Sequence, residues 1–278
     1  MECVHKILIS RTPPLSPIKV PCGQCIACKL NRASDWAVRI MHEKQMSVES
    51  YFLTLTYDEE HLPRVGKYST LVKDDIQKFL KRLRKSIAPV KLRYYLCGEY
   101  GETYGRCHFH VIVFLDSHPA DNFSRYVESA WSFGFVHIGS VSYDSACYVA
   151  RYCTKLLTGP KKTWYIERNI TPEFSLMSRR PGIGASWLEK YGSEVKTHHN
   201  VVVKGKKMSP PRYYRDKVYE ESDRCIVRNS VVDSIIARIK EEMSYNNSHN
   251  DSVYEDVVAD TRDVKIRARL GMKKRSKV

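Results

Sequence analysis

An apolar run at residues 108–115, rich in β-branched and aromatic side chains, begins with two histidines, His108 and His110. A run of this composition and length predicts a β-strand near the middle of the chain. Side chains alternate between the two faces of a strand, so both imidazoles project from the same face. Imidazoles held side by side on a rigid element suit a divalent metal ion. The doublet alone fits equally well a pair of packed structural histidines.

The neighbouring segments carry clear periodicities, alternating for strands and helical for helices. We expect strands at 51–57, 92–97, 108–115 and 135–141, and helices at 24–46, 72–87, 123–131 and 145–157. A Gly-rich turn at 98–105 joins the two central strands. This order predicts an α+β fold, a split βαββαβ antiparallel sheet with helices on one face.

Composition along the chain suggests three regions. Residues 1–50 form an N-terminal helical segment that contains cysteines, and residues 51–158 hold the predicted sheet. Residues 159–278 are basic and loop-rich, with one helical pattern at 227–239 and a basic tail at 262–277. We therefore expect a central core with an extension at each end.

The charge balance points to a polyanionic partner. The chain has 46 Lys and Arg against 31 Asp and Glu, a formal net charge of +15. Such an excess favours nucleic acid. The candidate contacts are Lys81, Arg82, Arg84 and Lys85 on the basic helix, with Arg179 and Arg180 in a later loop. Aromatic residues that could stack on bases are Tyr94, Tyr95, Tyr100, Tyr104, Trp131 and Trp164.

Membrane insertion and secretion are not expected. No apolar run approaches the ~20 residues that span a bilayer, and the N-terminus lacks the apolar stretch of a secretory signal. The nine cysteines are odd in number and scattered, which does not resemble a disulfide framework. A reducing cytoplasm is the expected location.

Two tyrosines and a lysine lie at i, i+4 and i+7 on the last helix of the core. Tyr148, Tyr152 and Lys155 therefore line one stripe, apart from the apolar stripe that can face the sheet. A phenol beside an ammonium group can act as a nucleophile, because the cation favours the phenolate. The alternative is a pair of half-buried aromatics with a solvated lysine.

A metal held by His108 and His110 needs at least one further ligand. Glu99, close to the turn that leads into the histidine strand, is the best-placed carboxylate, and Glu102 is the second choice. A metal there could polarise a scissile phosphate for attack by a tyrosine.

A second group of possible metal ligands lies near the N-terminus. Cys22, Cys25 and Cys28 are spaced by two residues each, and Cys3 or His5 could complete a tetrahedral zinc site. The alternative is a set of ordinary buried cysteines at the start of a helix.

Together these motifs resemble the HUH superfamily of single-strand nucleases. His108-Phe109-His110 is similar to its histidine–hydrophobe–histidine motif, and Phe52–Tyr57 to its first conserved strand. The Tyr148/Tyr152/Lys155 pattern resembles the two-tyrosine helix of rolling-circle replication initiators. Within that group the chain resembles the initiators of microviruses, and specifically those of the gokushovirus branch. The segments at 21–28 and 174–184 are also similar to segments of that branch.

The resemblance implies an HUH-type sheet and a metal-dependent endonuclease and strand-transferase. Such a protein nicks the plus-strand origin of a small circular phage genome, keeps the 5′ phosphate on tyrosine, and later rejoins the ends. It also implies Mg²⁺ or Mn²⁺ at the histidines, single-stranded and origin DNA as substrates, a host helicase and polymerase as partners, and the cytoplasm of a bacterial host as the location. Two alternatives stay open: an HUH relaxase or transposase, and a non-catalytic, zinc-organised nucleic-acid-binding protein.

Overall fold

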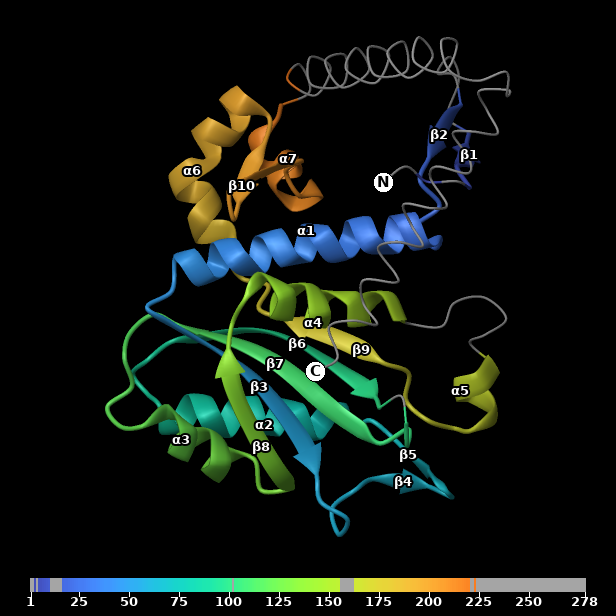
Figure 1. The fold of residues 1–278 in the computed structure, drawn as a ribbon, viewed down its shortest axis with the longest axis vertical. Helices are drawn as coiled ribbons and strands as arrows, with labels where there is room; N and C mark the ends of the chain where they lie inside the picture. Colours follow the sequence, from blue (N-terminus) through green and yellow to red (C-terminus); the bar gives the residue numbers. More distant parts are fainter. Residues whose placement is uncertain are drawn as a thin grey trace, which may run out of the picture. The chain divides into compact units, whose positions relative to one another are not determined.

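A five-stranded antiparallel sheet with the order β8-β3-β7-β6-β9 forms the centre of the fold (Figure 1). The computed structural model describes residues 3, 5–10, 17–101, 103–155, 163–220 and 223, and the side chains of 152–155 lie outside this description. The strands are β3 (Glu49–Tyr57), β6 (Leu92–Tyr100), β7 (Cys107–Leu115), β8 (Gly134–Ser140) and β9 (Phe174–Met177). All of them belong to a unit formed by Met1–Arg215, and Asp216–Val278 form a second unit.

The order of elements along the chain confirms the predicted α+β fold. The sequence β3, α2 (Lys73–Ser86), β6, β7, α3 (Phe123–Ala130), β8 is the expected βαββαβ arrangement. Strand β9 was not expected, because its four residues follow a stretch punctuated by prolines. It pairs with β6 over Tyr95–Gly98 and makes β6 an interior strand.

One face of the sheet packs on α2 and α3. The helix α2 turns its apolar stripe toward the sheet, and most of its basic residues, among them Lys81 and Lys85, are exposed. The buried side chains on this face include Leu53, Leu55, Phe109, Val111 and Val113 from the strands and Ile76, Phe79, Leu83, Phe123 and Val127 from the helices. This layer forms the larger of the two apolar cores.

The opposite face packs on α1 (Ile26–Gln45) and α4 (Tyr143–Lys155), so the expectation of helices on one face was wrong. The reason lies in β7, where Val111 and Val113 are buried on one face and Ile112 and Phe114 on the other. A strand that is apolar on both faces must be covered on both. The helices α1 and α4 also contact each other along their length (Figure 1).

Smaller elements complete the described chain. They are the strands β1 (Ile7–Ile9), β2 (Ile18–Val20), β4 (Arg64–Val65), β5 (Tyr68–Ser69), β10 (Val201–Val203) and β11 (Lys206–Met208), and the helices α5 (Thr163–Glu167), α6 (Ala185–His198) and α7 (Arg212–Val218). The helix expected at 227–239 and the tail at 262–277 lie outside the described residues. The division of the chain at residues 50 and 158 stays a prediction.

The helix α1 is fixed to α6 by an aromatic stack. The ring of His42 lies 3.6 Å from that of Trp187, centroid to centroid, and its Nδ1 is 3.1 Å from the hydroxyl of Tyr214. Burial lowers the pKa of His42 to about 4. The imidazole is therefore neutral near pH 7.

Among the described residues, none of the helices is long and apolar enough to cross a membrane.

Candidate metal centre and catalytic helix

Strands β6 and β7 bring three predicted ligands together. Residues directly opposite on the two strands include Glu99 with His108 and Cys97 with His110. Opposed residues project to the same side of a sheet, so Glu99 joins both histidines on the α1–α4 face. The strand β6 extends to Tyr100, which corrects the turn predicted to begin at residue 98. Glu99 is therefore held by the sheet.

The carboxylate of Glu99 lies between the two imidazoles. Its Oε1 is 2.8 Å from Nε2 of His108 and 2.9 Å from Nε2 of His110. Glu99 and His110 are buried, with 3% and 6% of their surface exposed. Their ligand atoms and that of His108 all lie within 4.8 Å of one another. One carboxylate and two imidazoles form a donor set that suits several divalent metals.

Further contacts orient both imidazoles. Nδ1 of His108 lies 3.1 Å from the carbonyl oxygen of Arg106, and Nδ1 of His110 lies 3.1 Å from the hydroxyl of Thr54. A carbonyl can only accept a hydrogen bond, so Nδ1 of His108 donates its proton there. The lone pair of Nε2 then faces a carboxylate oxygen, so a proton or a metal ion must lie between the two atoms. Outer partners of this kind are typical of histidines that bind metals.

Glu99 is an ionised acid in spite of its burial. Burial alone would raise the pKa of Glu99, but the hydrogen bonds and charges of His108 and His110 outweigh it and lower that pKa. The second oxygen, Oε2, is buried and has no hydrogen-bond partner in the described part of the chain. A buried carboxylate oxygen without a partner is the sort of atom that a metal ion would satisfy.

Gly98 allows β6 to lie close to its neighbours on the far side of the sheet. A Cβ atom at this position would stand 2.9 Å from Cδ2 of Leu71 and 3.1 Å from the ring of Phe109. Only glycine leaves space for both side chains. The tight packing beneath Gly98 fixes the backbone that carries Glu99.

Tyr148 extends from α4 toward these ligands. Its hydroxyl lies 3.4 Å from Oε1 of Glu99, and its ring centroid is 5.1 Å from that of His110, nearly at right angles. The side chain is 40% exposed. A phenol that is both accessible to solvent and next to a possible metal site can reach a phosphate bound there.

The chain is similar to replication-associated proteins of phages. The family model for the replication-associated protein ORF2 matches residues 50–157. The replication-associated protein VP4 of Bdellovibrio phage phiMH2K is 35% identical over 223 residues, which cover 73% of this chain and 68% of that protein. The chain belongs to the ORF2 family of replication-associated proteins.

Two further members of the ORF2 family are similar to the chain. The replication-associated protein ORF2 of Spiroplasma virus 4 is 31% identical over 73% of this chain and 68% of its own length. The replication-associated protein ORF4 of Chlamydia phage 1 is 28% identical over 71% of this chain, but only 53% of its own length is covered. None of the solved structures matches. The predicted resemblance to microvirus replication proteins of the gokushovirus branch is confirmed.

The end of the predicted catalytic helix is described in its backbone only, from 152 to 155, and residues 156 and 157 lie outside the described residues. Tyr152 and Lys155 lie within α4, but their side chains are outside the described part of the structure, as is all of Glu102, the second choice of ligand. The assignment of Tyr152 and Lys155 to catalysis therefore stays a prediction for this member of the ORF2 family.

The predicted DNA contacts fall into two groups. Lys81 and Lys85 are exposed on α2, which covers the face of the sheet opposite to Glu99 and the histidines. Arg82 lies between them but packs inward, where its Nε donates to the carbonyl of Ala130 at 2.8 Å. Arg179 and Arg180 follow the edge strand β9 along the chain, and their side chains are exposed. Whether these residues bind DNA stays a prediction.

Two of the predicted stacking aromatics cannot reach DNA. Tyr95 and Trp131 are 0% and 2% exposed and belong to the two cores, so their assignment to base stacking was wrong. Both side chains fill the core, and burial accounts for their aromatic character. Tyr104, by contrast, is 91% exposed and lies in the turn that joins β6 to β7.

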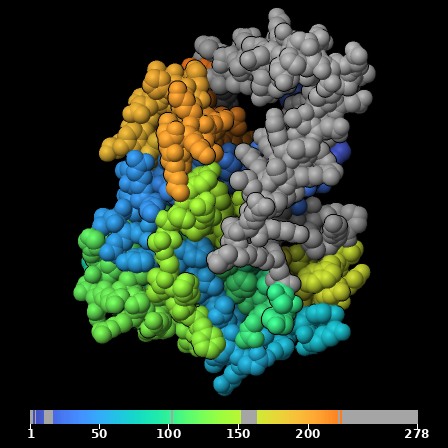
Figure 2. Space-filling view, viewed as in Figure 1, coloured from blue at the N-terminus to red at the C-terminus, as the bar shows by residue number. Residues whose placement is uncertain are grey.

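The end of the sheet that carries the site is flanked by two small elements, the β4–β5 hairpin and α5 (Figures 1 and 2). The hydroxyl of Ser69 in β5 donates to the carbonyl of Gly105 at 2.7 Å, and the hydroxyl of Tyr100 donates to the carbonyl of Thr171 at 2.6 Å. These bonds tie the β6–β7 turn to its surroundings.

Sequence reasoning missed two residues of the site face. Thr54 and Phe135 stand on β3 and β8, in register with the histidine strand, and Phe135 is 70% exposed. The alternation of threonines with leucines at 53–56 marks a polar face beside the histidines, and this signal could have identified Thr54.

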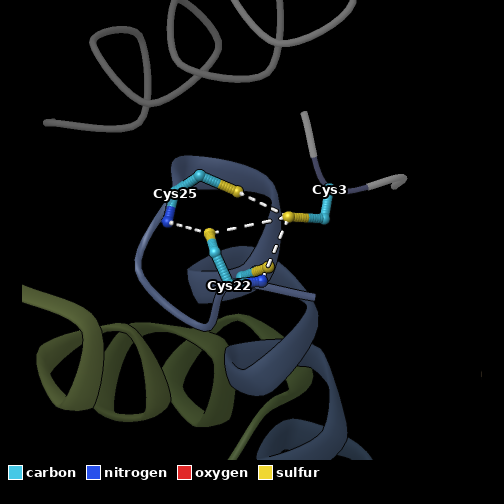
Figure 3. A group of neighbouring side chains, drawn as sticks. Cys3, Cys22 and Cys25 are labelled. Atoms are coloured by element: carbon cyan, nitrogen blue, oxygen red, sulfur yellow. Dashed lines mark hydrogen bonds between the residues drawn. The ribbon is translucent and has the colours of Figure 1, made fainter. Parts of the chain in front are cut away.

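The four cysteines predicted as zinc ligands form a separate group, which Figure 3 shows in part. Cys3, Cys22, Cys25 and Cys28 are close together, whereas His5 is exposed and not part of the group. Backbone N–H groups of Cys25 and Gln24 lower the pKa of Cys22 to about 6, and burial raises the pKa of Cys28 to about 12.

Proposed function

We propose that the protein initiates rolling-circle replication of a small circular single-stranded phage genome, by nicking the plus strand at its origin and later rejoining the ends. The observation that carries this proposal is the group formed by Glu99, His108 and His110 with the hydroxyl of Tyr148 beside it. The relatives of the chain are replication-associated proteins of phages, which agrees with this activity.

The residues present fit a divalent cation. The contacts of Glu99 with the two imidazoles are 2.8 and 2.9 Å, near the ~3 Å between adjacent ligands of an octahedral ion with bonds of about 2.1 Å. We propose Mg²⁺ or Mn²⁺ for this group, with Glu99, His108 and His110 as ligands. When bound, the ion neutralises and polarises the scissile phosphate.

The protein itself supplies the nucleophile. One tyrosine oxygen of α4 attacks the phosphorus, a Tyr–O–P bond forms, and the bond to the 3′ oxygen breaks. The phenol loses its proton in this step, and the departing 3′ oxygen gains one to become the hydroxyl that primes synthesis. Lys155 favours the phenolate and balances charge on the phosphate. We expect Tyr152, nearer to Lys155 along the helix, to attack first.

The second tyrosine explains how the cycle restarts. Tyr148 and Tyr152 are one helical turn apart, so both can serve one phosphate site. After one round of synthesis the free tyrosine attacks the regenerated origin and releases a 3′ hydroxyl. This hydroxyl attacks the 5′ phosphate held on the first tyrosine, so that the Tyr–O–P bond breaks, the displaced circle closes and the first tyrosine recovers its proton. Strand separation and synthesis would be carried out by a host helicase and polymerase in the cytoplasm of a bacterial host.

A covalent-adduct assay tests this function. The full-length protein is incubated with a labelled single-stranded oligonucleotide of the origin, with Mn²⁺ or with EDTA, and the products are separated under denaturing conditions. A metal-dependent protein–DNA adduct, mapped by mass spectrometry to Tyr148 or Tyr152, is the expected result. Tight binding without any adduct would instead support a non-catalytic nucleic-acid-binding protein.

The substrate separates the initiator from a relaxase or transposase that uses the same chemistry. We expect cleavage of origin sequence from a phage replicative form, and no preference for plasmid transfer origins or transposon ends. The reverse preference would assign the same site to a different biological process.

A further inference from the structure

Four cysteine sulfurs converge from two distant parts of the chain at the start of α1. Sγ of Cys3 lies 3.5 Å from Sγ of Cys22 and 3.7 Å from Sγ of Cys25 (Figure 3). Cys28, in the first turn of α1, joins them, and the four sulfurs are all within 4.8 Å of one another. Cys3 and Cys28 are buried. This clustering is not a consequence of sequence proximity, because 19 residues separate Cys3 from Cys22.

The sulfurs are arranged as single ligands rather than as disulfides. A disulfide requires about 2.05 Å between its sulfurs, whereas all four of these thiols are free. Thiolates bound to zinc at about 2.3 Å in a tetrahedron stand ~3.8 Å apart. The observed separations of 3.5 and 3.7 Å are close to this spacing.

Backbone N–H groups near the cysteines point toward the sulfurs. The N–H of Cys25 donates to Sγ of Cys22, and the N–H of Cys22 donates to Sγ of Cys3, both at 3.3 Å. Gly23 has a φ of +73°, which permits the tight turn between Cys22 and Cys25. Hydrogen bonds from backbone N–H groups stabilise charged sulfur, as a metal site needs.

Positive charge lies next to the cluster. A Cβ atom at Gly23 would stand 3.8 Å from Nη2 of Arg32, so this guanidinium reaches the turn that carries Cys22. Four thiolates and one Zn²⁺ carry a net charge of −2. The first two turns of α1 contain the basic residues Lys29 and Arg32 and no acidic residue, which suits an anionic centre.

We propose that Cys3, Cys22, Cys25 and Cys28 bind one structural zinc ion that joins the N-terminal segment to the first turn of α1. All four positions are protein ligands, so the site is closed and has no place for a substrate. Each thiol loses its proton to solvent as the ion binds. The centre is distinct from the Glu99/His108/His110 group, which faces α4 from the sheet.

The position of the site suggests what the zinc stabilises. Figure 1 shows α1 and α4 side by side and antiparallel, with the start of α1 and the end of α4 at the same end of the pair. Small buried residues on the two helices, among them Ala37, Ala146 and Ala150, allow them to pack closely. An ion that anchors the start of α1 therefore supports the helix carrying Tyr148 and Tyr152.

Metal analysis of the full-length protein tests the proposal. Protein purified without chelator from zinc-supplemented cells is expected to contain one zinc per chain by elemental analysis. After exchange with Co²⁺ it should show the intense charge-transfer and visible bands of tetrahedral thiolate coordination. Cys25→Ser should remove these bands and most of the zinc, and Cys3→Ser should weaken zinc binding by at least tenfold.

Matched controls separate this site from the other metal group. Cys107→Ser changes a buried cysteine outside the cluster, and Glu99→Gln with His110→Ala disables the sheet site; both should leave the cobalt bands and the zinc content unchanged. The inference is overturned by wild-type protein that contains no zinc, contains iron instead, or carries a Cys3–Cys22 disulfide by mass spectrometry. It is equally overturned by zinc that survives Cys25→Ser. The wild-type measurements decide the matter even when a variant does not fold.

Discussion

Glu99 and His108 face each other across neighbouring antiparallel strands, and a carboxylate oxygen of the first lies 2.8 Å from Nε2 of the second. The sequence indicated Glu99 as a ligand beside the histidines, but it placed the residue in a turn, nine positions before His108, and did not give this cross-strand register. This register arises because β6 continues past Gly98 to Tyr100. The acid is thereby held in a sheet and has little freedom to move away from the imidazoles.

Replacing Glu99 by glutamine should severely slow metal-dependent nicking. The amide keeps the size of the side chain but loses the charge that a divalent cation requires. We expect the rate of adduct formation to fall on the order of 100-fold or more, because a bound metal contributes several kcal/mol to such reactions. Rates measured across a Mn²⁺ titration test this. Glu102→Gln is the matched control, and loss of activity in that variant alone would move the ligand role to Glu102.

The two tyrosines should have separable roles. Tyr152→Phe is expected to prevent the first nick on an origin oligonucleotide, whereas Tyr148→Phe should permit that nick and block the second transfer. Both variants keep the aromatic ring and lose the nucleophilic oxygen, so folding is preserved. Adduct formation and circle release are measured separately by denaturing gels. First nicking that needs Tyr148 and tolerates Tyr152→Phe would reverse the assignment.

The space beneath Gly98 should tolerate no side chain. Gly98→Ala places a Cβ 2.9 Å from Leu71 and 3.1 Å from the ring of Phe109. We expect a loss of about 1–3 kcal/mol in the free energy of unfolding, as for other overpacked cores. Gly139→Ala on β8 is the control, because the nearest atom to its Cβ would be 3.9 Å away. Urea denaturation of both variants makes the comparison, and equal stabilities would show that β6 can shift.

Acidification should destabilise the protein through His42. Burial lowers its pKa in the folded protein to about 4, while an unfolded histidine titrates near 6.5. Between these values the unfolded chain takes up a proton that the folded protein does not bind, so stability falls as the pH drops through this range. The total loss is about 3 kcal/mol, at ~1.4 kcal/mol for each tenfold difference in proton affinity.

A substitution isolates this effect. His42→Gln is expected to be less stable at pH 7 but to lose the dependence on pH between 6.5 and 4.5, as measured by urea denaturation at a series of pH values. His198→Gln alters an exposed histidine at the end of α6 and should keep the wild-type dependence. Parallel curves for the wild type and His42→Gln would show that other groups govern acid stability.

The basic surface of α2 should matter only for long DNA. It covers the face opposite the metal centre, so a strand bound at Glu99 reaches Lys81 and Lys85 only by passing around the sheet. We expect Lys81→Glu with Lys85→Glu to weaken binding to origin duplex and to reduce the slope of log K against log salt by about 2. Cleavage of a short oligonucleotide should be unchanged. Equal losses on both substrates would place these lysines at the cleavage site.

Much of the fold could be predicted because its signals are local. The βαββαβ order follows from periodicity, and His108 and His110 share a face because strands alternate. The covering of the second face by α1 and α4 required knowing that Ile112 and Phe114 are buried as fully as Val111 and Val113. Periodicity alone does not distinguish a strand buried on one side from one buried on both.

Tyr148, Glu99 and Cys3 were named from the sequence and Thr54 was not, but the contacts that bring these residues into a site join distant segments of the chain. Thr54 meets His110 across strands that are 56 positions apart, and Tyr148 meets Glu99 across 49. Cys3 was one of two choices for the fourth ligand of the cysteine group, and only the path of the N-terminal segment distinguishes it from His5. The strand register and the path of the chain decide these contacts, and the spacing of residues in the sequence predicts neither.

Strand β9 sets the smallest fragment in which the candidate metal centre can be studied. A fragment that ended at residue 158 would contain the βαββαβ core but would leave the outer hydrogen-bonding groups of β6 exposed along the strand that carries Glu99. Unpaired edges of this kind recruit other chains and promote aggregation. Fragments made for expression should therefore extend at least through Met177, so that the edge of β6 is closed by its own chain.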